Sequence, residues 1–242
     1  MKDRIEDLLE RSRRNSTFYF SDFLTQADAA LVWTVADERE VTLFGGTEGT
    51  ERVVARFGDP EEFGYEEDFP IAVLKAEPLN QKFADSLTHR DFLGALMNLG
   101  IDRSVVGDII VRDNAAYIFA LEKIAPFIAE SLTRVKHTSV KTVQISEVPE
   151  GAGPQLAPME IIVPSLRLDV IIAKCYNLSR TRAKDCFRAG EVFLNSRECA
   201  NPDAVIHEDD TLSVRGYGKL VFREIGRETK KGSLVVRIEK YI

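Results

Sequence analysis

Apolar and charged positions follow helical spacing near the start of the chain. Ile5, Leu8 and Leu9 fall on one side of a helix whose other positions are mostly charged or polar, and this pattern predicts an amphipathic helix. An acidic, turn-rich stretch over 59–70 separates this region from the next. We therefore expect an N-terminal α/β subdomain over residues 1–70. Its predicted elements are helices over 1–14 and 25–35, a strand over 40–44, and a segment over 50–58 that fits either a strand or a helix.

The pattern between residues 71 and 148 is more regular and switches between strand-like and helix-like spacing. Asp113 and Asn114 mark a tight turn between two strands. Pro126 fits the first turn of a helix, where its missing N–H costs no hydrogen bond. The order of the elements is βαββαβ, which predicts a plait-like domain over 71–148. The predicted elements are a strand over 71–76, a helix over 85–99, strands over 108–112 and 115–121, a helix over 122–132 and a strand over 140–146.

Three prolines and two glycines fall within residues 149–158, a composition typical of a linker, which we place at 149–160. A third unit is expected over 161–242, and the fold class of the whole chain is α+β. Ser179 and Gly190 bracket one helix of this unit, as a serine N-cap and a glycine just past the helix end commonly do. The predicted elements are helices over 166–175 and 180–189, then short strands over 192–195 and 211–214.

Composition narrows the class of protein. The 242 residues are 44% hydrophobic and 29% charged, which is typical of a globular protein with a substantial core. No run approaches the roughly 18 apolar residues of a membrane helix, and the mixed-charge N-terminus lacks the apolar core of a signal peptide. The three cysteines form no CxxC pair. We expect a reduced, cytoplasmic protein with no metal site, no cofactor and no membrane partner.

The net charge of −7 is unevenly distributed. Residues 161–242 hold 15 Lys and Arg against 11 Asp and Glu, and residues 1–160 hold 17 against 28. A positive excess confined to one unit indicates that this unit faces a polyanion.

The basic residues of the third unit form a pattern on its second helix. Arg180, Lys184 and Arg188 are spaced i, i+4, i+8 and therefore share one side, while Ala183 and Phe187 face the core. Arginine beside the free amides of a helix N-terminus is a suitable phosphate clamp. The predicted RNA-binding residues are Arg167, Lys174, Ser179, Arg180, Arg182, Lys184, Arg188, Asn195, Arg215 and Lys219.

The order of these motifs resembles a known module. Arg167-Leu168-Asp169, Ser179-Arg180, Gly190 with Val192 and Asn195, and Asp209-Asp210 before a strand occur in sequence. Over about 166–225 the chain is similar to the small RNA-binding domain named after the fourth protein of the small ribosomal subunit, also called the αL motif. One departure is Glu208-Asp209-Asp210, where that family commonly has Gly-Asp. The resemblance implies binding to structured RNA.

A second resemblance covers the whole chain. The segment from His89 to Ile101, followed by Arg103 and Gly107-Asp108-Ile109, and Thr229-Lys230-Lys231-Gly232 near the end, are similar to YlmH-type bacterial proteins. The resemblance implies an N-terminal α/β region, a plait-like domain and a C-terminal RNA-binding domain. It also implies a non-catalytic protein that acts on ribosomes, at the large subunit with rRNA or tRNA, in rescue or quality control of stalled translation. A link to cell division and to protein partners is implied as well.

Two other functions remain alternatives. Arg167-Leu168-Asp169 resembles the catalytic triplet of pseudouridine synthases, although the 73 residues that follow Asp169 are too few for the usual catalytic domain. A scaffold for division proteins is the other alternative. A kinase is excluded because Leu96 stands where the catalytic loop after His89-Arg90-Asp91 requires asparagine.

The plait-like domain offers further candidate contacts. Arg90 and Arg103 are possible RNA-binding residues, and Tyr117 and Phe119 lie on a strand where RNA-recognition plaits carry stacking aromatics. Without the accompanying basic and glycine signature, we interpret these two rings as core residues.

Overall fold

The computed structural model describes residues 1–149, 153–230 and 232–241. The chain divides into two compact units, Met1–Pro154 and Gln155–Ile242. Within the described residues, no helix is both long enough and apolar enough to cross a membrane, and no three His, Cys, Asp or Glu side chains converge as metal ligands.

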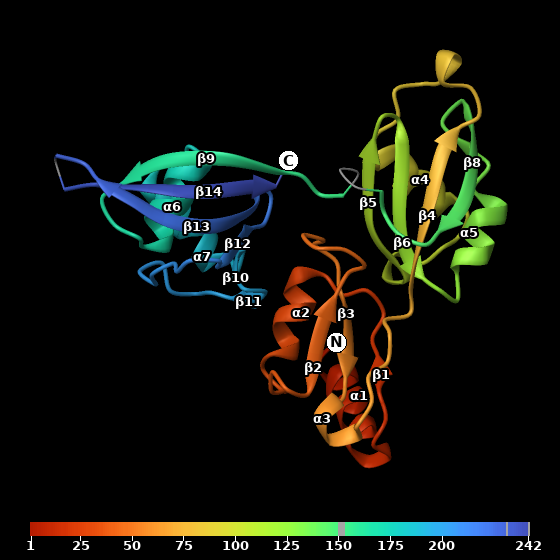
Figure 1. The fold of residues 1–242 in the computed structure, drawn as a ribbon, viewed down its shortest axis with the longest axis horizontal. Coiled ribbons are helices and arrows are strands. Elements are labelled where there is room, and N and C mark those ends of the chain that lie inside the picture. Colours follow the sequence, from red (N-terminus) through yellow and green to blue (C-terminus); the bar gives the residue numbers. More distant parts are fainter. Residues whose placement is uncertain (150–152, 231, 242) are drawn as a thin grey trace. The chain divides into compact units, whose positions relative to one another are not determined.

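The N-terminal subdomain packs helices against a small antiparallel sheet in the strand order β1-β3-β2 (Figure 1). Ile5 and Leu9 of the first helix are buried against Val32 and Phe57, as the helical spacing predicts. The ambiguous segment over 50–58 contains a strand, not a helix. The elements are α1 (Lys2–Asn15), β1 (Tyr19–Phe20), α2 (Gln26–Val32), β2 (Val41–Phe44), β3 (Val54–Phe57) and α3 (Pro60–Phe63).

The middle domain has the predicted βαββαβ order. Its strands pair antiparallel in the order β5-β6-β4-β8-β7, which is the plait arrangement with a small β7–β8 hairpin added at one edge. Asp113 and Asn114 form the expected turn, with φ of 48° and 63°. The elements are β4 (Ile71–Pro78), the 3-10 turn η1 (Gln81–Phe83), α4 (His89–Asn98), η2 (Arg103–Val105), β5 (Val106–Arg112), β6 (Ala115–Leu121), α5 (Ala125–Ser131), β7 (Arg134–Val135) and β8 (Thr138–Ile145).

The two faces of this sheet bury different side chains. On one face, Leu74 and Ile118 pack with Phe92 of α4 and Ile128 of α5. Side chains alternate along a strand, so Phe119 points to the opposite face. There it joins Phe23, Val54 and Val73 in a second cluster, which includes residues of the N-terminal subdomain. This subdomain therefore closes part of the face that the two helices leave open.

Two glycines allow this close packing. A Cβ on Gly46, whose φ is +100°, would lie 2.4 Å from the ring of Phe119, and one on Gly107 would lie 2.6 Å from the ring of Phe23. Neither position leaves room for a larger side chain without movement of an aromatic ring. The glycines thus fix how closely the N-terminal subdomain approaches the plait.

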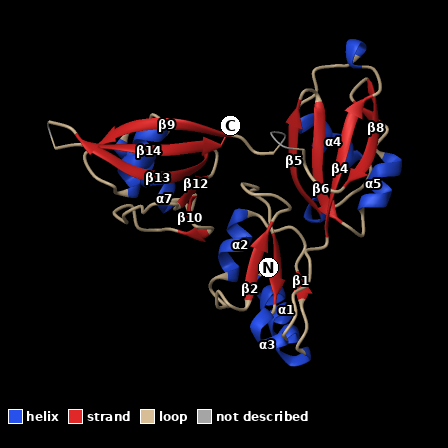
Figure 2. Cartoon of the chain, viewed as in Figure 1, coloured by secondary structure: helices blue, strands red, loops and turns tan. Residues whose placement is uncertain are grey.

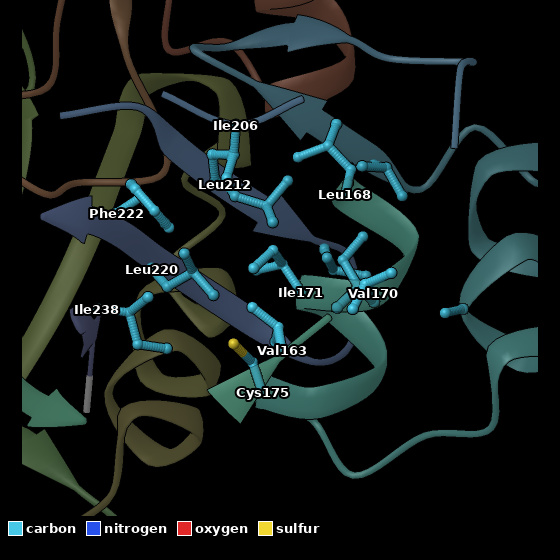
Figure 3. Packing of buried hydrophobic residues seen from close by; sticks show 14 of the residues in the cluster. Val163, Leu168, Val170, Ile171, Cys175, Ile206, Leu212, Leu220, Phe222 and Ile238 are labelled. Atoms are coloured by element: carbon cyan, nitrogen blue, oxygen red, sulfur yellow. The ribbon is translucent and has the colours of Figure 1, made fainter. Parts of the chain in front are cut away.

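The second unit is a six-stranded antiparallel sheet in the order β11-β10-β12-β13-β14-β9. Two helices pack on one face (Figure 2). Figure 3 shows the resulting core, in which Ile171 of a helix lies beside Leu220 and Val163 of the sheet. The elements are β9 (Leu156–Val163), α6 (Leu168–Cys175), α7 (Arg180–Arg188), β10 (Val192–Leu194), β11 (Arg197–Glu198), β12 (Thr211–Val214), β13 (Gly218–Glu228) and β14 (Leu234–Tyr241).

The linker expected at 149–160 is shorter in the structure, because a strand takes up its last residues. Strand β9 begins at Leu156 and pairs with β14, including Pro158 opposite Glu239. A proline is compatible with a strand at the edge of a sheet, where its missing N–H breaks no ladder bond, and β9 is such a strand. Residues 150–152 of the expected linker lie outside the described residues.

Candidate nucleic-acid interface

Helix α7 carries most of the predicted site and is capped at both ends as the sequence predicts. The hydroxyl of Ser179 accepts a hydrogen bond from the backbone N–H of Arg182 at 3.1 Å, and Gly190 follows the helix with φ of +64°. Ala183, Cys186 and Phe187 are buried in the core of the second unit. The opposite side of the helix is therefore left to basic side chains in contact with solvent.

The carboxylate of Asp169 organises these basic side chains. Asp169 is fully buried. It belongs to the first turn of α6 and lies next to the start of α7. Arg167 donates to it from Nε and Nη2, both at 3.1 Å, and Arg180 donates from Nη2 at 2.7 Å. The ammonium of Lys184 lies 3.9 Å from the same carboxylate. Three cations from two helices thus converge on one buried anion.

The charges explain why this arrangement is stable. Burial disfavours the ionised form of Asp169, but the hydrogen bonds from Arg167 and Arg180 outweigh burial and hold the pKa of its carboxyl below the usual range. The carboxylate is therefore charged at neutral pH. It also offsets the cost of a cation such as Arg180 in the first turn of a helix, where the dipole disfavours positive charge.

The cluster keeps a positive excess and remains accessible. The side chains of Arg167, Arg180 and Lys184 are 34%, 50% and 40% exposed. Arg167 also forms an ion pair with Asp203, so the cluster holds three basic and two acidic groups. We name Arg167, Asp169, Arg180, Lys184 and Asp203 the Asp169 cluster.

A second basic group lies on the other flank of α7. Arg182 is about 200° around the helix from Arg180, because each residue turns the helix by about 100°. Its Nε donates to the hydroxyl of Tyr217 at 3.1 Å. The ring of Tyr217 lies 5.8 Å from that of Tyr176, and the ammonium of Lys240 lies 4.7 Å from the centre of the Tyr176 ring. Cationic and aromatic side chains in such contact suit the phosphates and bases of RNA.

Four other predicted residues of this unit are basic. Lys174, Arg188 and Arg215 are exposed, and Arg188 pairs with Asp185 at 2.7 Å. The ammonium of Lys219 lies 5.0 Å from the centre of the Tyr241 ring. These four side chains lie at the surface or near it, on or beside α6, α7 and the β12–β13 turn.

Asn195 has a structural role that the RNA-binding interpretation did not include, whereas the capping role of Ser179 was predicted. The amide of Asn195 donates to Asp210 at 2.7 Å and accepts from the backbone N–H of Thr211 at 2.8 Å. Asn195 itself has φ of 50°. Its side chain thus holds the β10–β11 turn against β12, just as Ser179 holds the start of α7.

Arg90 and Arg103 lie in the first unit and differ from each other. Arg90 is exposed at the start of α4. The guanidinium of Arg103 donates to the carbonyls of Val106 and Gly107, the latter at 2.9 Å. Burial, together with the nearby charge of Arg52, lowers the pKa of Arg103 to about 10. Arg103 is therefore half-buried and bonded to backbone carbonyls, whereas Arg90 is exposed.

The Arg103 site is part of the contact between the N-terminal subdomain and the plait. Arg52 donates to the carbonyls of Phe23, Arg103 and Val106 at 3.0, 3.2 and 3.1 Å. Asp108 accepts from the backbone N–H of Glu51 at 2.6 Å. Burial raises the pKa of the Asp108 carboxyl despite these donors. Three of these four contacts join the two parts of the first unit, and the bond to Phe23 lies within the N-terminal subdomain.

The aromatic side chains of β6 are not an open RNA platform. Phe119 has no exposed surface, and Tyr117 is 7% exposed. Tyr117 lies directly between Lys75 of β4 and Ile110 of β5 in the sheet. The interpretation of these rings as core residues is confirmed, because the N-terminal subdomain covers Phe119.

Sequence reasoning missed Tyr176, Lys240 and Asp203 as members of the two basic groups. Asp203 pairs with Arg167, and Tyr176 and Lys240 join the Arg182 group through Tyr217. These contacts span long sequence separations, which residue spacing does not reveal. Asp169 orients Arg167 and the start of the neighbouring helix α7 through its contacts with Arg167 and Arg180.

The family-model match and the sequence relative agree with the resemblance noted from the sequence. Residues 64–148 match the family model described as a putative RNA-binding domain in YlmH. The chain is 29% identical over 231 residues to the Bacillus subtilis "Ribosome-associated protein quality control protein P2", a match that covers 91% of this chain and 86% of that protein. A solved structure, "Cell division protein ylmH from Streptococcus pneumoniae", is 19% identical with a TM-score of 0.47, covering 59% of this chain and 87% of that one.

Proposed function

We propose that this chain, which resembles YlmH-type proteins over most of its length, is a non-catalytic RNA-binding protein of the cytoplasm that acts on the ribosome. Its C-terminal unit would bind structured RNA, either rRNA of the large subunit or tRNA, in the manner of the αL motif. Its physiological role would be rescue or quality control of stalled translation. The name of the Bacillus subtilis relative supports this role.

The observation that carries the proposal is the Asp169 cluster. A buried carboxylate fixes two guanidinium groups and an ammonium group in place, so these side chains lose little further rotamer freedom when they meet phosphates. Each cation still presents a third to a half of its side chain to solvent. Arginine can hold a carboxylate with one edge of its planar group and a phosphate with another.

The distribution of charge favours RNA over an acidic protein surface. Helix α7 alone holds four basic residues and one acidic residue, and its second basic group is built around Tyr176 and Tyr217. Phosphate contacts position such a module on RNA, and the helix shape and the 2′-hydroxyls supply selectivity. The acidic first unit would discourage indiscriminate binding to nucleic acid.

Catalysis of the pseudouridine-synthase type has no support at Asp169. A catalytic carboxylate must reach the substrate, and Asp169 is fully buried with both oxygens bonded to arginine. The Arg-Leu-Asp triplet acts in this chain as a positioning device for Arg167 and Arg180. We therefore assign the triplet to RNA binding and not to chemistry.

Salt-dependent binding tests the proposal. Arg180→Ala with Lys184→Ala in the full chain removes two cations from the Asp169 cluster. If each neutralises one phosphate, the slope of log affinity against log salt for purified bacterial large ribosomal subunits should shrink by about 1.4 to 1.8. A matched control is Lys2→Ala with Arg14→Ala, which removes two exposed cations from α1 and should leave the slope unchanged. An unchanged slope in the first variant would remove the Asp169 cluster from the interface.

Sedimentation through sucrose tests the ribosomal partner. The tagged full chain should travel with large subunits at low salt and dissociate at high salt, and tRNA should be recovered with it. Migration as free protein at both salt concentrations would contradict the ribosomal assignment.

A further inference from the structure

The most exposed large apolar side chains of the described residues lie together at one end of the plait. Phe83 is 78% exposed and Leu79 is 67% exposed. Both belong to the connection between β4 and α4, and the 3-10 turn over 81–83 projects beyond the end of the sheet (Figure 1, gold). We name residues 79–83 the plait tip. Exposure of this much apolar surface to water is unfavourable in free energy, and contact with a partner would remove that surface from water.

The plait tip is held in position by its neighbours. The side chain of Asn80 accepts from the backbone N–H of Lys82 at 3.1 Å, and the backbone N–H of Leu79 donates to Ser139 of β8 at 3.0 Å. On the far side of the turn, the N–H of Asp85 donates to the hydroxyl of Thr138 at 2.8 Å. Bonds to β8 on both sides therefore hold the turn that carries Phe83, and its backbone need not be ordered afresh when a partner binds.

One basic side chain lies beside the exposed ring, and two more lie on the β7–β8 hairpin, next to the β4–α4 connection. The ammonium of Lys82 lies 5.6 Å from the centre of the Phe83 ring. Lys136 donates to the carbonyl of Ser86 at 3.4 Å, and Arg134 of the same hairpin donates to the carbonyl of Lys136 at 3.1 Å. An aromatic face beside cations matches a nucleotide, whose base stacks while its phosphate meets the positive charge.

The nearby acidic groups are already occupied. Asp85 accepts from the hydroxyl of Thr138 at 2.9 Å and from the N–H of His137 at 3.2 Å. Asp91 accepts from the hydroxyl of Thr88 at 2.6 Å and pairs with Lys136 at 2.8 Å. These carboxylates shape the loop and the helix start. The cation next to the Phe83 ring, Lys82, is exposed.

The other aromatic side chains of the matched segment 64–148 suit stacking less well. Phe119 and Tyr117 are buried, as described above. Tyr65 packs edge-on against Phe18 at 5.0 Å, and Phe127 is 43% exposed on α5. Phe83 combines the greatest exposure with an adjacent cation.

We propose that Phe83 stacks on an unpaired RNA base and that Lys82 contacts the neighbouring phosphate. The inference rests on the proposed RNA-binding function and adds a second contact, in the plait, to the one in the C-terminal unit. It assigns to the plait a stacking site on a loop instead of on the sheet face that RNA-recognition plaits use.

Affinity measurements with purified bacterial large ribosomal subunits test this site in the full chain. A stacked base is worth about 1 to 3 kcal/mol on alanine substitution, so Phe83→Ala should weaken binding about 5- to 150-fold with no change in salt slope. Phe83→Tyr should bind like the wild type. Lys82→Ala should reduce the salt slope by about 0.7 to 0.9. Phe127→Ala, on an exposed ring of the same domain, is the matched control and should have no effect.

Phe83→Leu distinguishes RNA from a protein groove. Leucine keeps apolar surface but not an aromatic face, so a stacking site predicts a loss as large as that of Phe83→Ala. Wild-type affinity in the leucine variant, with a loss only in the alanine variant, would indicate an apolar protein partner and overturn the proposal. Cross-linking with 254 nm light, followed by nuclease digestion and mass spectrometry, should place a nucleotide adduct on the peptide that contains Phe83.

The outcomes separate this inference from the function on which it rests. If the wild-type chain binds subunits and Phe83→Ala binds equally well, the plait tip is not a contact, and RNA binding by the C-terminal unit stands. If the wild-type chain does not bind, both proposals fail. Unchanged thermal unfolding of the Phe83 variants is expected because the side chain is exposed, and this confirms that any loss of affinity is not a loss of fold.

Discussion

The plait and the C-terminal unit share a layout, an antiparallel sheet with two helices packed on one face, but they differ in what they leave accessible. In the plait, the N-terminal subdomain covers Phe119 on the other face, so the usual stacking surface is closed. In the C-terminal unit, the accessible chemistry lies at the helices, in the Asp169 cluster and around Tyr217. The comparison teaches that a plait matched to an RNA-binding family does not by itself place RNA on its sheet.

Phe119→Ala tests most directly whether the sheet face of the plait is closed to RNA. Phe119 is fully buried, and removal of such a ring costs about 3 to 5 kcal/mol. We expect the free energy of unfolding of the first unit to fall by this amount in chemical denaturation of the full chain. Affinity for large subunits, measured where the variant is still folded, should be unchanged.

Phe83→Ala is the matched counterpart, because it should lower affinity without lowering stability. A Phe119→Ala variant that loses affinity but keeps its stability would reopen the sheet face as an RNA platform. The two phenylalanines thus test the closed face and the exposed tip of the same domain against each other.

Asp169→Asn tests the accessible basic site of the C-terminal unit. The substitution preserves shape but leaves the cations of Arg167, Arg180 and Lys184 without their buried anion. Loss of one partner of a fully buried pair costs about 3 to 5 kcal/mol, and the partial exposure of the cations reduces our expectation to about 2 to 3 kcal/mol. The free energy of unfolding of the second unit should fall accordingly, and the salt-dependent part of RNA binding should weaken because the cations are no longer held in place.

The pH dependence of the unfolding free energy tests whether the charge of Asp169 stabilises the second unit. Its folded-state pKa lies below the unfolded value of about 3.9, so its stabilising contribution is complete above that pH and is lost as pH falls through the lower folded-state pKa. The difference in unfolding free energy between wild type and Asp169→Asn should therefore shrink below about pH 4. A difference that stays constant in this range would show that packing, and not charge, stabilises the cluster.

The sequence predicted well those features that depend on neighbours along the chain. Ser179 and Gly190 flank α7 at its two ends, as their capping preferences predict. The βαββαβ order of the plait follows from alternating strand-like and helix-like periodicities. The unsettled segment over 50–58 shows the limit of this reasoning. Residues 54–57 are all buried, so they lack the alternation that identifies a half-exposed strand.

Features that depend on distant residues were not predictable in the same way. The first part of strand β9 was assigned to a linker because Pro158 and its neighbours resemble one, and only pairing with β14 makes them an edge strand. Residue spacing gave no sign that Arg103 lies against Arg52, because this contact requires the fold of the N-terminal subdomain. Asn195 likewise has a partner, Asp210, in another part of the chain.

Arg103→Ala and Arg90→Ala test the smallest expected effect. They compare a half-buried and an exposed arginine of the plait. Arg103→Ala removes hydrogen bonds to the carbonyls of Val106 and Gly107, each worth about 1.5 to 3 kcal/mol for a charged donor, but it also relieves repulsion with Arg52. We expect a net loss of about 1 kcal/mol in unfolding free energy, with an unchanged salt slope for subunit binding.

Arg90 should show the opposite behaviour, because its side chain is exposed on the same domain. Arg90→Ala should leave the unfolding free energy unchanged, and it should reduce the salt slope by at most about 0.9, the contribution of one phosphate. A reduced slope in Arg103→Ala at full stability would mean that its guanidinium leaves the carbonyls of Val106 and Gly107 for RNA. In that case the contact between the N-terminal subdomain and the plait would open on binding, and the closed sheet face would be closed only in the free protein.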